Sequence, residues 1–270
     1  MTMVKNRKKY TYDTRVEIKN RKINPKIKLV IKYSEIDPKD VYGFYLTNKT
    51  TKNNSKCLPD IGSFVDVYPD FIALETEPGL FNKTSLTCVS WFKDDQYFDT
   101  IDGLYNAIIY KDETLLKFYK TRYSNVKMFI SIDYSTYGDF DEETLLHNIK
   151  KACVVFLWLT FEIDAIVYPL MTYGTEKTLD WCFEHIMIGS NVALSLKGVM
   201  EGKERELFQK ALNVLIDTRR PKALIVYTIA SKESSDEILK YAIEKNTPIF
   251  YVANTLQERN CGGAYNGKKV

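Results

Sequence analysis

The sequence lacks the motifs that mark several large enzyme classes. It has no G-x-x-x-x-G-K-[ST] sequence, which argues against a P-loop nucleotide hydrolase, and no G-x-G-x-x-G after a predicted strand, which argues against the common dinucleotide-binding fold. A G-x-S-x-G sequence is also missing, and only two histidines, His147 and His185, are available for a Ser-His-Asp arrangement. No motif therefore identifies a reaction.

Long apolar runs are also missing from the chain. The best candidate for a membrane span, Ala152 to Phe161, falls far short of the roughly 18 residues that such a helix needs. The basic N-terminal residues are not followed by the apolar stretch of a signal peptide. With 45% apolar and 27% charged residues, the composition is that of a folded protein. We therefore expect an intracellular, cytoplasmic protein without a membrane partner.

The five cysteines are an odd number at irregular spacing, which favours reduced thiols over a disulfide framework. Cys182 and His185 are three residues apart, a spacing that places both on one face of a helix. A structural zinc site needs four ligands, and no Cys-x-x-Cys pair is present to complete one. Cysteine and histidine therefore predict no metal site.

Positive charge is concentrated at the N-terminus. Residues 1–33 contain 11 Lys or Arg and 2 acidic residues, whereas the whole chain carries a net charge of only +3. A basic arm on an acidic body suggests binding to nucleic acid through phosphate contacts, although a solvated tail or a lysine-rich composition would look the same. The candidate nucleic-acid-binding residues are Lys5, Arg7, Lys8, Lys9, Arg15, Lys19, Arg21 and Lys22.

From about residue 104 the sequence alternates short apolar, β-branched runs with segments of helical spacing. The predicted strands are Asn106 to Tyr110, Lys127 to Asp133, Asp164 to Leu170, Asn191 to Lys197, Lys222 to Thr228 and Thr247 to Ala253. Their ends are 23 to 37 residues apart, which suits β-α crossovers. We predict an α/β fold with a mainly parallel sheet, favouring a partial or complete β/α barrel over an open doubly wound sheet.

Helices are expected between these strands. Asp141 or Thr144 would begin a helix that runs through Leu159, and Thr175 would begin one over TEKTLDWCFEHIM. The apolar stripe in KERELFQKALNVLIDTRRPK predicts a helix ending before Pro221. Ser234 or Ser235 would cap a helix over DEILKYAIEKN.

The N-terminal part of the chain has few helical stripes. Its strand-like runs are Ile27 to Tyr33, Val41 to Leu46, Ser63 to Leu74 and Ser85 to Phe92. They fit either a small β-rich subdomain or the first strands of a closed barrel. We divide the chain into a basic arm (1–26), a β-rich N-terminal part (27–103), an α/β domain (104–255) and a C-terminal tail (256–270).

Ligands bind α/β sheets at the carboxyl ends of parallel strands, so polar residues that follow the predicted strands are candidate site residues. Asp133 and Asp139 flank a glycine-containing loop and suit acid–base catalysis or a divalent cation, the one cofactor we consider. Lys197 suits binding of a phosphate or carboxylate. Candidate ligand-binding residues are Ser135, Tyr137, Thr172, Tyr173, Gly198, Thr228 and Asn254.

Three segments carry a resemblance to a known family: ISIDYSTYGD, IDAIVYPLMTYGTEKTLDWCFEHI and SNVALSLKGVMEGKERELFQKALNVLIDTRRPKALIVYT. Over about 100 residues the chain resembles an uncharacterised domain family encoded on phages, plasmids and other mobile elements of mostly AT-rich bacteria, although it lacks the family's proline before Asp133. The resemblance implies a mobile-element origin, a bacterial host cell and emphasis on Asp133, Ser135, Trp181 and Gly198. It implies no activity.

Three hypotheses about function remain open. The leading one is a nucleic-acid-associated protein that uses the basic arm. The second is an enzyme for a small phosphorylated or carboxylated, hence anionic, ligand that uses Asp133, Asp139 and Lys197 as catalytic residues. The third is a non-catalytic protein that binds host proteins, for which the 19 tyrosines and 14 phenylalanines would supply contacts. The sequence does not indicate an oligomeric state.

Overall fold

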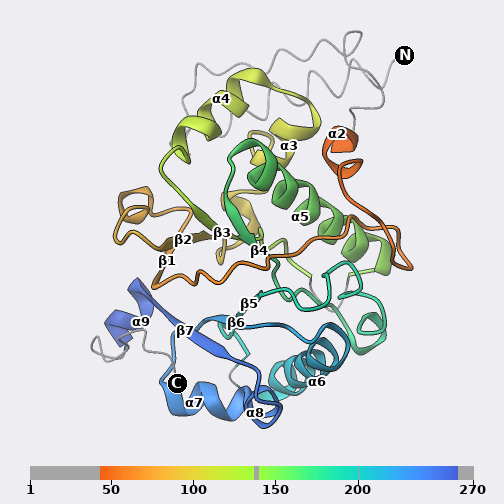
Figure 1. Ribbon diagram of the computed structural model, residues 1–270, viewed down its shortest axis with the longest axis vertical. Coiled ribbons are helices and arrows are strands. Elements are labelled where there is room, and N and C mark those ends of the chain that lie inside the picture. Colours follow the sequence, from red (N-terminus) through yellow and green to blue (C-terminus); the bar gives the residue numbers. More distant parts are fainter. Residues whose placement is uncertain (1–42, 137–139, 200, 261–270) are drawn as a thin grey trace.

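A computed structural model describes residues 43–136, 140–199 and 201–260 (Figure 1). Within these residues, seven strands form one sheet in which every neighbouring pair is parallel. The strands are β1 (Phe71–Leu74), β2 (Thr87–Ser90), β3 (Met128–Ile130), β4 (Ile166–Tyr168), β5 (Val192–Ser195), β6 (Leu224–Tyr227) and β7 (Ile249–Asn254). The protein therefore has an α/β fold with a parallel sheet, as the sequence predicts.

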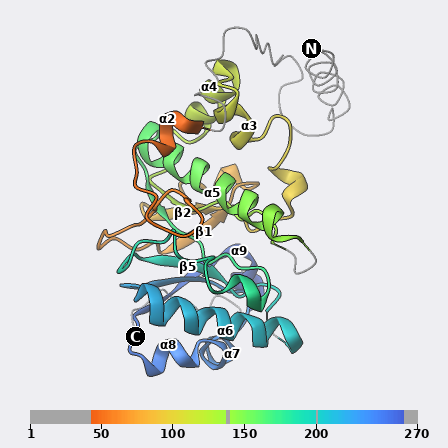
Figure 2. The same cartoon turned by 90° about the vertical axis from the view of Figure 1, so that its right-hand side faces the viewer.

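Helices occupy most of the connections between strands. The α-helices are α2 (Phe44–Thr47), α3 (Leu104–Ile109), α4 (Glu113–Arg122), α5 (Glu142–Glu162), α6 (Gly202–Arg219), α7 (Lys232–Ile238), α8 (Lys240–Glu244) and α9 (Thr255–Asn260). Short 3-10 helices are η2 (Pro78–Leu80), η3 (Asp95–Tyr97) and η4 (Glu176–Thr178). The two longest helices, α5 and α6, lie on opposite sides of the strands (Figure 2).

The sheet curves into a nearly closed β/α barrel. Its strand order, β4-β3-β2-β1-β7-β6-β5, leaves β4 and β5 at the two edges. Just beyond β4, Leu170 forms a parallel bridge with Ala193 of β5. The Ala193 N–H donates to the Pro169 carbonyl at 2.8 Å, and the Met171 N–H donates to the Ala193 carbonyl at 2.8 Å. These bonds join the two edges, so that the strands follow one another around the barrel in chain order.

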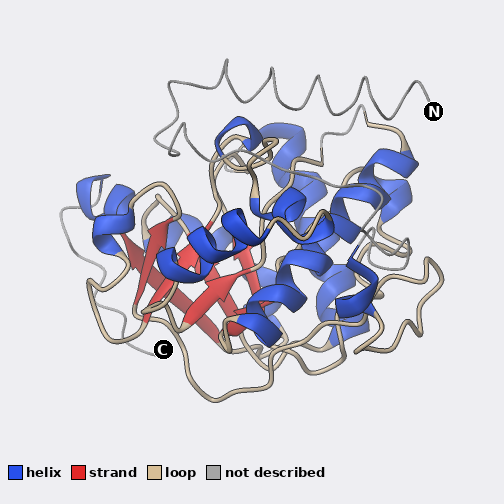
Figure 3. Cartoon of the chain, turned by 90° about the horizontal axis from the view of Figure 1, so that it is seen from above, coloured by secondary structure: helices blue, strands red, loops and turns tan. Residues whose placement is uncertain are grey.

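Side chains alternate between the barrel interior and the surrounding helices, as they must in a strand. The interior cluster contains Ile72, Leu74, Cys88, Phe92, Met128, Ile130, Tyr168, Leu170, Ala193, Ile225, Tyr227 and Val252. The other face of each strand, for example Phe71, Val89 and Phe129, packs in a larger cluster with the helices. Figure 3 shows helices lying along the outside of the strands. The interior is therefore packed with side chains.

A segment that precedes β1, residues 63–68, closes the amino-terminal end of the barrel. The Tyr68 ring stacks on Phe250 near the start of β7 at a centroid distance of 3.9 Å. The Asn191 side chain, just before β5, donates to the Val65 carbonyl at 2.8 Å. We call residues 63–68 the barrel floor. Because the floor covers this end, the opposite end is where a ligand would enter.

Five of the six strands predicted after residue 104 are confirmed as β3 to β7. The sixth is wrong, since Asn106 to Ile109 belongs to helix α3. A short apolar run such as LYNAII fits a buried helix as well as a strand, and here it forms a buried helix that packs against α4 and α5. The N-terminal strands β1 and β2 pair with β7 and β3, so they are the first strands of the barrel.

Other predicted elements need correction. Phe44 to Leu46, predicted as part of a strand, lies in the short helix α2, because Gly43 turns the chain with a φ of 69°. The segment TEKTLDWCFEHIM contains only the three-residue η4, followed by turns. Thr175 and Thr178 form a capping box around η4, but no longer helix follows it. The cap of α7 is Ser231, not Ser234 or Ser235 as predicted, so the helix begins earlier. Predicted strand Ile27 to Tyr33 lies outside the described residues.

Two predicted helices are confirmed. Helix α5 begins after Asp141, whose carboxylate accepts the Thr144 N–H at 2.7 Å. Helix α6 buries Phe208, Ala211, Leu212, Leu215 and Ile216 along one stripe. None of the helices within residues 43–136, 140–199 and 201–260 has the length and apolarity needed to cross a bilayer.

Candidate functional site

The candidate site is the carboxyl-terminal end of the barrel, which we call the barrel mouth. It comprises the ends of β1 to β7 and the loops that follow them. The predicted residue Asp133 lies three residues beyond β3, and Lys197 lies two residues beyond β5. Parallel strands bring such loops to one edge, where helix amino termini also point.

Asp133 has the most perturbed carboxyl group of the mouth. Burial raises its pKa to about 7 from an ordinary 3.8, the negative charge of Asp95 raises the pKa further, and the positive charge of Lys197 opposes the rise. Asp133 is half-buried, whereas Lys197 is exposed. Asp95 and Lys197 follow two other strands, yet both lie close enough to Asp133 for their charges to act on its carboxyl group. At neutral pH the Asp133 carboxyl is therefore divided between its acid and its carboxylate.

Asp95, which the sequence analysis missed, holds the loop that carries Asp133. Its carboxylate accepts the Ser135 N–H at 3.0 and 3.2 Å and the Ser135 hydroxyl at 2.9 Å. Burial raises the pKa of Asp95, and the hydrogen bonds from Ser135 counteract that rise. Asp95 therefore fixes the loop after β3 while adding negative charge beside Asp133.

Two further hydrogen bonds fix the same loop. The Asn148 side chain on α5 donates to the Ser135 carbonyl at 2.7 Å. The Thr136 hydroxyl donates to the Tyr173 carbonyl, in the connection after β4, at 2.6 Å. Together with Asp95, these bonds tie residues 133–136 to three other parts of the fold. Such support keeps a reacting side chain in one geometry.

Behind the loop, Lys151 on α5 is a buried cation that is only 6% exposed. Its ammonium lies 2.5 Å from the Asp99 carboxylate and 4.0 Å from the centroid of the Tyr134 ring. A buried ammonium needs such partners because leaving water is costly. The Lys151–Asp99 pair joins α5 to the loop that carries Asp95, and Tyr134 adjoins Asp133 in sequence.

The other predicted ligand-binding residues are placed as follows. Tyr173 is half-buried, and its pKa lies above the ordinary value because of burial and the charges of Glu204 and Asp133. Thr172 is half-buried before it, and Gly198 is exposed with a φ of 87°. The buried Thr228 accepts from Asn254 through its carbonyl oxygen at 2.9 Å. Gly198 thus adjoins Lys197 in the sequence, and Tyr173 lies close enough to Asp133 for the Asp133 charge to act on it.

Several predicted residues lie outside the described part of the chain. They are Tyr137 and Asp139 in the loop after β3 and the arm residues Lys5, Arg7, Lys8, Lys9, Arg15, Lys19, Arg21 and Lys22. Among the described residues, no group of three or more His, Cys, Asp or Glu is placed to hold a metal ion. The site for a divalent cation at Asp133 and Asp139 stays a prediction.

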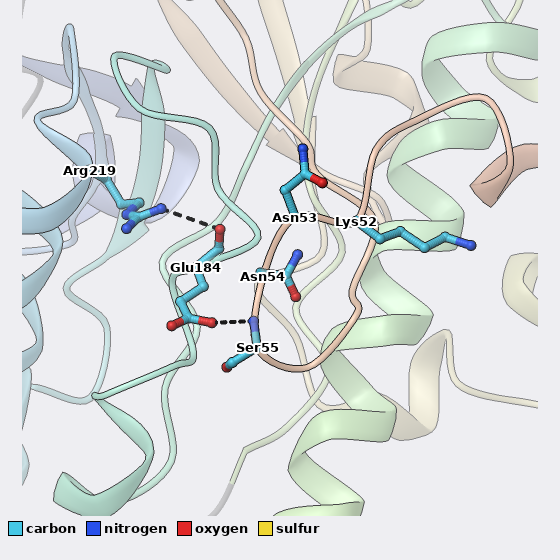
Figure 4. A pocket seen from close by; sticks show the side chains of 6 residues that line it. All are labelled: Lys52, Asn53, Asn54, Ser55, Glu184 and Arg219. Carbon is cyan, nitrogen blue, oxygen red and sulfur yellow. Dashed lines mark hydrogen bonds between the residues drawn. The ribbon is translucent and has the colours of Figure 1, made fainter.

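An open cavity of about 400 Å³ lies on the flank of the barrel (Figure 4). It is lined by Lys52, Asn53, Asn54, Ser55, Glu184 and Arg219. The Glu184 carboxylate accepts the Ser55 N–H at 2.7 Å, which lowers the pKa of Glu184. Arg219 donates to the carbonyl oxygens of Glu184 and Ile186 at 3.3 and 3.4 Å. Glu184 and Arg219 are therefore already engaged in bonds to the backbone, and this cavity is a weaker candidate than the mouth.

The fold and the mouth define a β/α-barrel protein with a charged site at the carboxyl ends of its strands. Residues 59–244, more than half of the chain, match the family described as a domain of unknown function, DUF4417. The chain belongs to this family. The match starts just before the barrel floor and includes Asp95, Asp133 and Lys197.

Two curated proteins are similar to the chain. Gene 1 protein of Mycobacterium phage L5 is 31% identical over 109 residues, which are 39% of this chain and 46% of that protein. Gene 1 protein of Mycobacterium phage D29 is 28% identical over 140 residues, 51% of this chain and 47% of that protein. The chain thus spans about half the length of the curated relatives it matches. The predicted resemblance to an uncharacterised, phage-encoded family is confirmed. No solved structure matches the chain.

Proposed function

We propose that the barrel mouth binds a small phosphorylated or carboxylated ligand and that Asp133 exchanges a proton with it. The observation that supports this proposal is that the charges of Asp95 and Lys197, which follow other strands, act on Asp133, whose burial raises its pKa to about 7. A general acid or base works best when its pKa lies near the working pH. Lys197 is exposed and can attract the anionic group of the ligand.

The arrangement of the mouth supports this division of roles. Asp133 is buried enough to keep its proton near neutrality, and its loop is fixed by Asp95, whereas the Lys197 ammonium remains in water. Strongly shifted carboxyl groups beside a specific charge partner occur at functional sites more often than elsewhere. Asp133 is therefore the proposed catalytic residue, Lys197 the proposed anion-binding residue and Asp95 a positioning residue.

A thermal-shift screen with phosphorylated and carboxylated compounds tests the proposal. A compound that binds raises the melting temperature according to its affinity and concentration. We expect Lys197→Met to remove the shift. Lys127→Met is the matched control, because Lys127 is exposed at the amino-terminal end of β3, away from the mouth. Equal shifts in both variants would exclude Lys197 as the anion-binding residue.

The same screen with Mg²⁺ or Mn²⁺ tests the predicted divalent cation. If Asp133 and Asp139 hold a cation, each metal raises the melting temperature of the parent protein, and Asp139→Asn reduces the rise. If neither metal has an effect, the role of Asp133 is acid–base chemistry alone.

The charge distribution supports a second candidate function, nucleic-acid association through the arm in the cytoplasm of a bacterial host. Eleven of the 38 basic residues fall within residues 1–33, and the relatives are phage proteins. Binding through phosphate contacts weakens steeply with salt. We expect deletion of residues 1–26 to abolish binding of a DNA duplex at 50 mM salt. An unchanged binding curve would exclude the arm as the DNA-binding segment.

The non-catalytic alternative is binding to host proteins. It predicts that no small molecule raises the melting temperature and that the unmodified chain captures a host protein.

A further inference from the structure

A second open cavity lies at the other end of the barrel from the mouth, where helices α6 and α8 end. Its walls are the last residues of α6, the residues that follow α8, and the segments that lead into β6 and β7. The two helices pack against each other beside the start of β7 (Figure 1). The volume of the cavity is about 420 Å³, which is the size of a site for a small molecule. We call it the helix-end cavity.

Two cationic side chains line the helix-end cavity. Arg220, the residue after α6, is exposed and forms no ion pair or side-chain hydrogen bond with any residue of 43–136, 140–199 and 201–260. Lys245, the residue after α8, is exposed as well, and its ammonium lies 3.7 Å from the Asp217 carboxylate. That distance is too long for a hydrogen bond. Both cations can therefore bind an anion without losing a strong interaction.

The remaining polar groups of the lining also favour an anion. Asp217 is the one acid among the lining residues, and its carboxylate already accepts the Tyr241 hydroxyl, with distances of 2.8 and 2.9 Å to its two oxygens. The side chains of Asn246 and Thr247 line the cavity without a hydrogen-bond partner in the described part of the chain. The amide and the hydroxyl add neutral donors to the two cations.

The backbone at Arg220 indicates that its side chain serves a purpose other than stability. Arg220 has a φ of 48° and a ψ of 58°, and its N–H donates to the Ile216 carbonyl at 3.1 Å. A left-handed residue that ends a helix is usually glycine, because a Cβ raises the free energy of this conformation. Strained positions of this kind are found preferentially at ligand sites. An arginine in place of glycine here therefore supports a binding role for the guanidinium.

The shape and charge of the cavity indicate the class of ligand. Three apolar side chains, those of Ile216, Pro221 and Pro248, form part of its wall. They can contact the carbon part of a ligand, and the volume has room for one. A guanidinium binds two phosphate oxygens side by side. A phosphate monoester carries a charge of about −1.5 to −2 at neutral pH and thus matches two cations better than a carboxylate does.

We propose that the helix-end cavity binds a small phosphate monoester that has an apolar body, with the phosphate on Arg220 and Lys245 and the body against the two prolines. This site is separate from the mouth. Its residues precede β6 and β7, whereas Asp133 and Lys197 follow strands β3 and β5. The inference therefore goes beyond the proposed function and does not depend on it.

Calorimetric titration of the full-length protein with phenyl phosphate, inorganic phosphate and benzoate tests the inference. We expect phenyl phosphate to bind more tightly than inorganic phosphate, because its ring is removed from water, and more tightly than benzoate, because its charge is larger. Arg220→Gly should lower the affinity for phenyl phosphate at least about tenfold, since it removes charged hydrogen bonds. Without ligand, this variant should melt at the same or a higher temperature, because glycine suits the left-handed backbone.

Lys222→Met is the matched control for the loss of one positive charge. Lys222 is an exposed lysine two residues after Arg220, and it pairs with Asp66 instead of lining the cavity. This variant should bind phenyl phosphate within about twofold of the parent.

The outcomes separate this inference from the proposed function. Unchanged affinity for phenyl phosphate in Arg220→Gly, benzoate binding as tight as that of phenyl phosphate, or no binding of any of the three compounds would each overturn the inference. If Lys197→Met lost phenyl phosphate and Arg220→Gly kept it, the compound would belong to the mouth, and the helix-end cavity would be excluded. Should Arg220→Gly not fold, Arg220→Met must show the same loss of affinity.

Discussion

Asp133 binds its proton in the folded protein at a pH where an unfolded chain has released it. Its pKa is about 7 in the barrel against an ordinary 3.8. Between these values the folded state holds a proton that the unfolded state lacks, so this residue makes the free energy of unfolding fall as pH rises toward 7, and the loss is complete above 7. The raised pKa that suits Asp133 to the proposed proton exchange therefore comes at a cost in stability.

Asp133→Asn should accordingly stabilise the protein at pH 8 and not at pH 4. At about 1.4 kcal/mol for each pKa unit, the gain at pH 8 lies between about 1 and 4 kcal/mol. Urea unfolding at the two pH values measures it. A gain of equal size at pH 4 and pH 8 would contradict a raised pKa.

Lys151 is the second residue whose charge matters at the mouth, because it holds Asp99 and the Tyr134 ring in place. Replacing it by methionine leaves Asp99 unpaired and the Tyr134 ring without its cation, while the apolar stem is preserved. We expect Lys151→Met to lower the free energy of unfolding by about 1–3 kcal/mol. Lys150→Met changes the adjacent, exposed lysine of the same helix and should alter stability by less than about 0.5 kcal/mol. Equal effects of the two changes on the free energy of unfolding would show that the buried Lys151–Asp99 pair contributes no more to stability than an exposed lysine does.

At the scale of the element, the start of α5 depends on one carboxylate. Asp141 accepts the Thr144 N–H and, through its other oxygen, the Thr144 hydroxyl at 3.1 Å. Asp141→Ala removes this cap and should lower the free energy of unfolding. Asp141→Asn retains a capping oxygen and should lower the free energy of unfolding by clearly less. Guanidinium unfolding of both variants compares them, and a loss in the asparagine variant as large as in the alanine variant would rule out capping.

Element prediction succeeded where a periodic pattern extended far enough to choose between helix and strand. The apolar run of β6 lies between turn residues, and α6 is 18 residues long with a buried stripe from Phe208 to Ile216, so both were predicted from the sequence. The run at Leu104–Ile109 is too short for its period to distinguish the two, and packing against α4 and α5 decided the outcome. Local pattern thus predicts long elements and fails on short apolar ones.

The candidate site was predictable only where a residue directly follows a strand. Asp133 and Lys197 could be chosen by this rule, because strand ends are visible in the sequence. Asp95 could not, since it lies five residues beyond β2 among other acids in KDDQYFD. Its contact with Ser135 depends on the pairing of β2 with β3, which no local pattern encodes.

At the scale of the whole molecule, the barrel has one weakly paired junction, between β4 and β5, which we call the seam. The six pairs of neighbouring strands are joined by ladders, whereas β4 and β5 meet through the single bridge between Leu170 and Ala193. We expect the amides of Met171 and Ala193 to exchange with deuterium faster than those of β6, which has a paired strand on each side. Hydrogen exchange followed by mass spectrometry measures this difference. Slower exchange at the seam than in β6 would contradict it.

The floor of the barrel also has a consequence for how the chain is made. Val65 leaves the ribosome early, yet its partner Asn191 is 126 residues further along, and Phe250, on which Tyr68 stacks, comes later still. Closing a loop of that length has an entropic cost, and contacts so distant in sequence form slowly. The segment that closes the amino-terminal end of the barrel therefore has to wait without these two partners until the chain has been synthesised beyond residue 250.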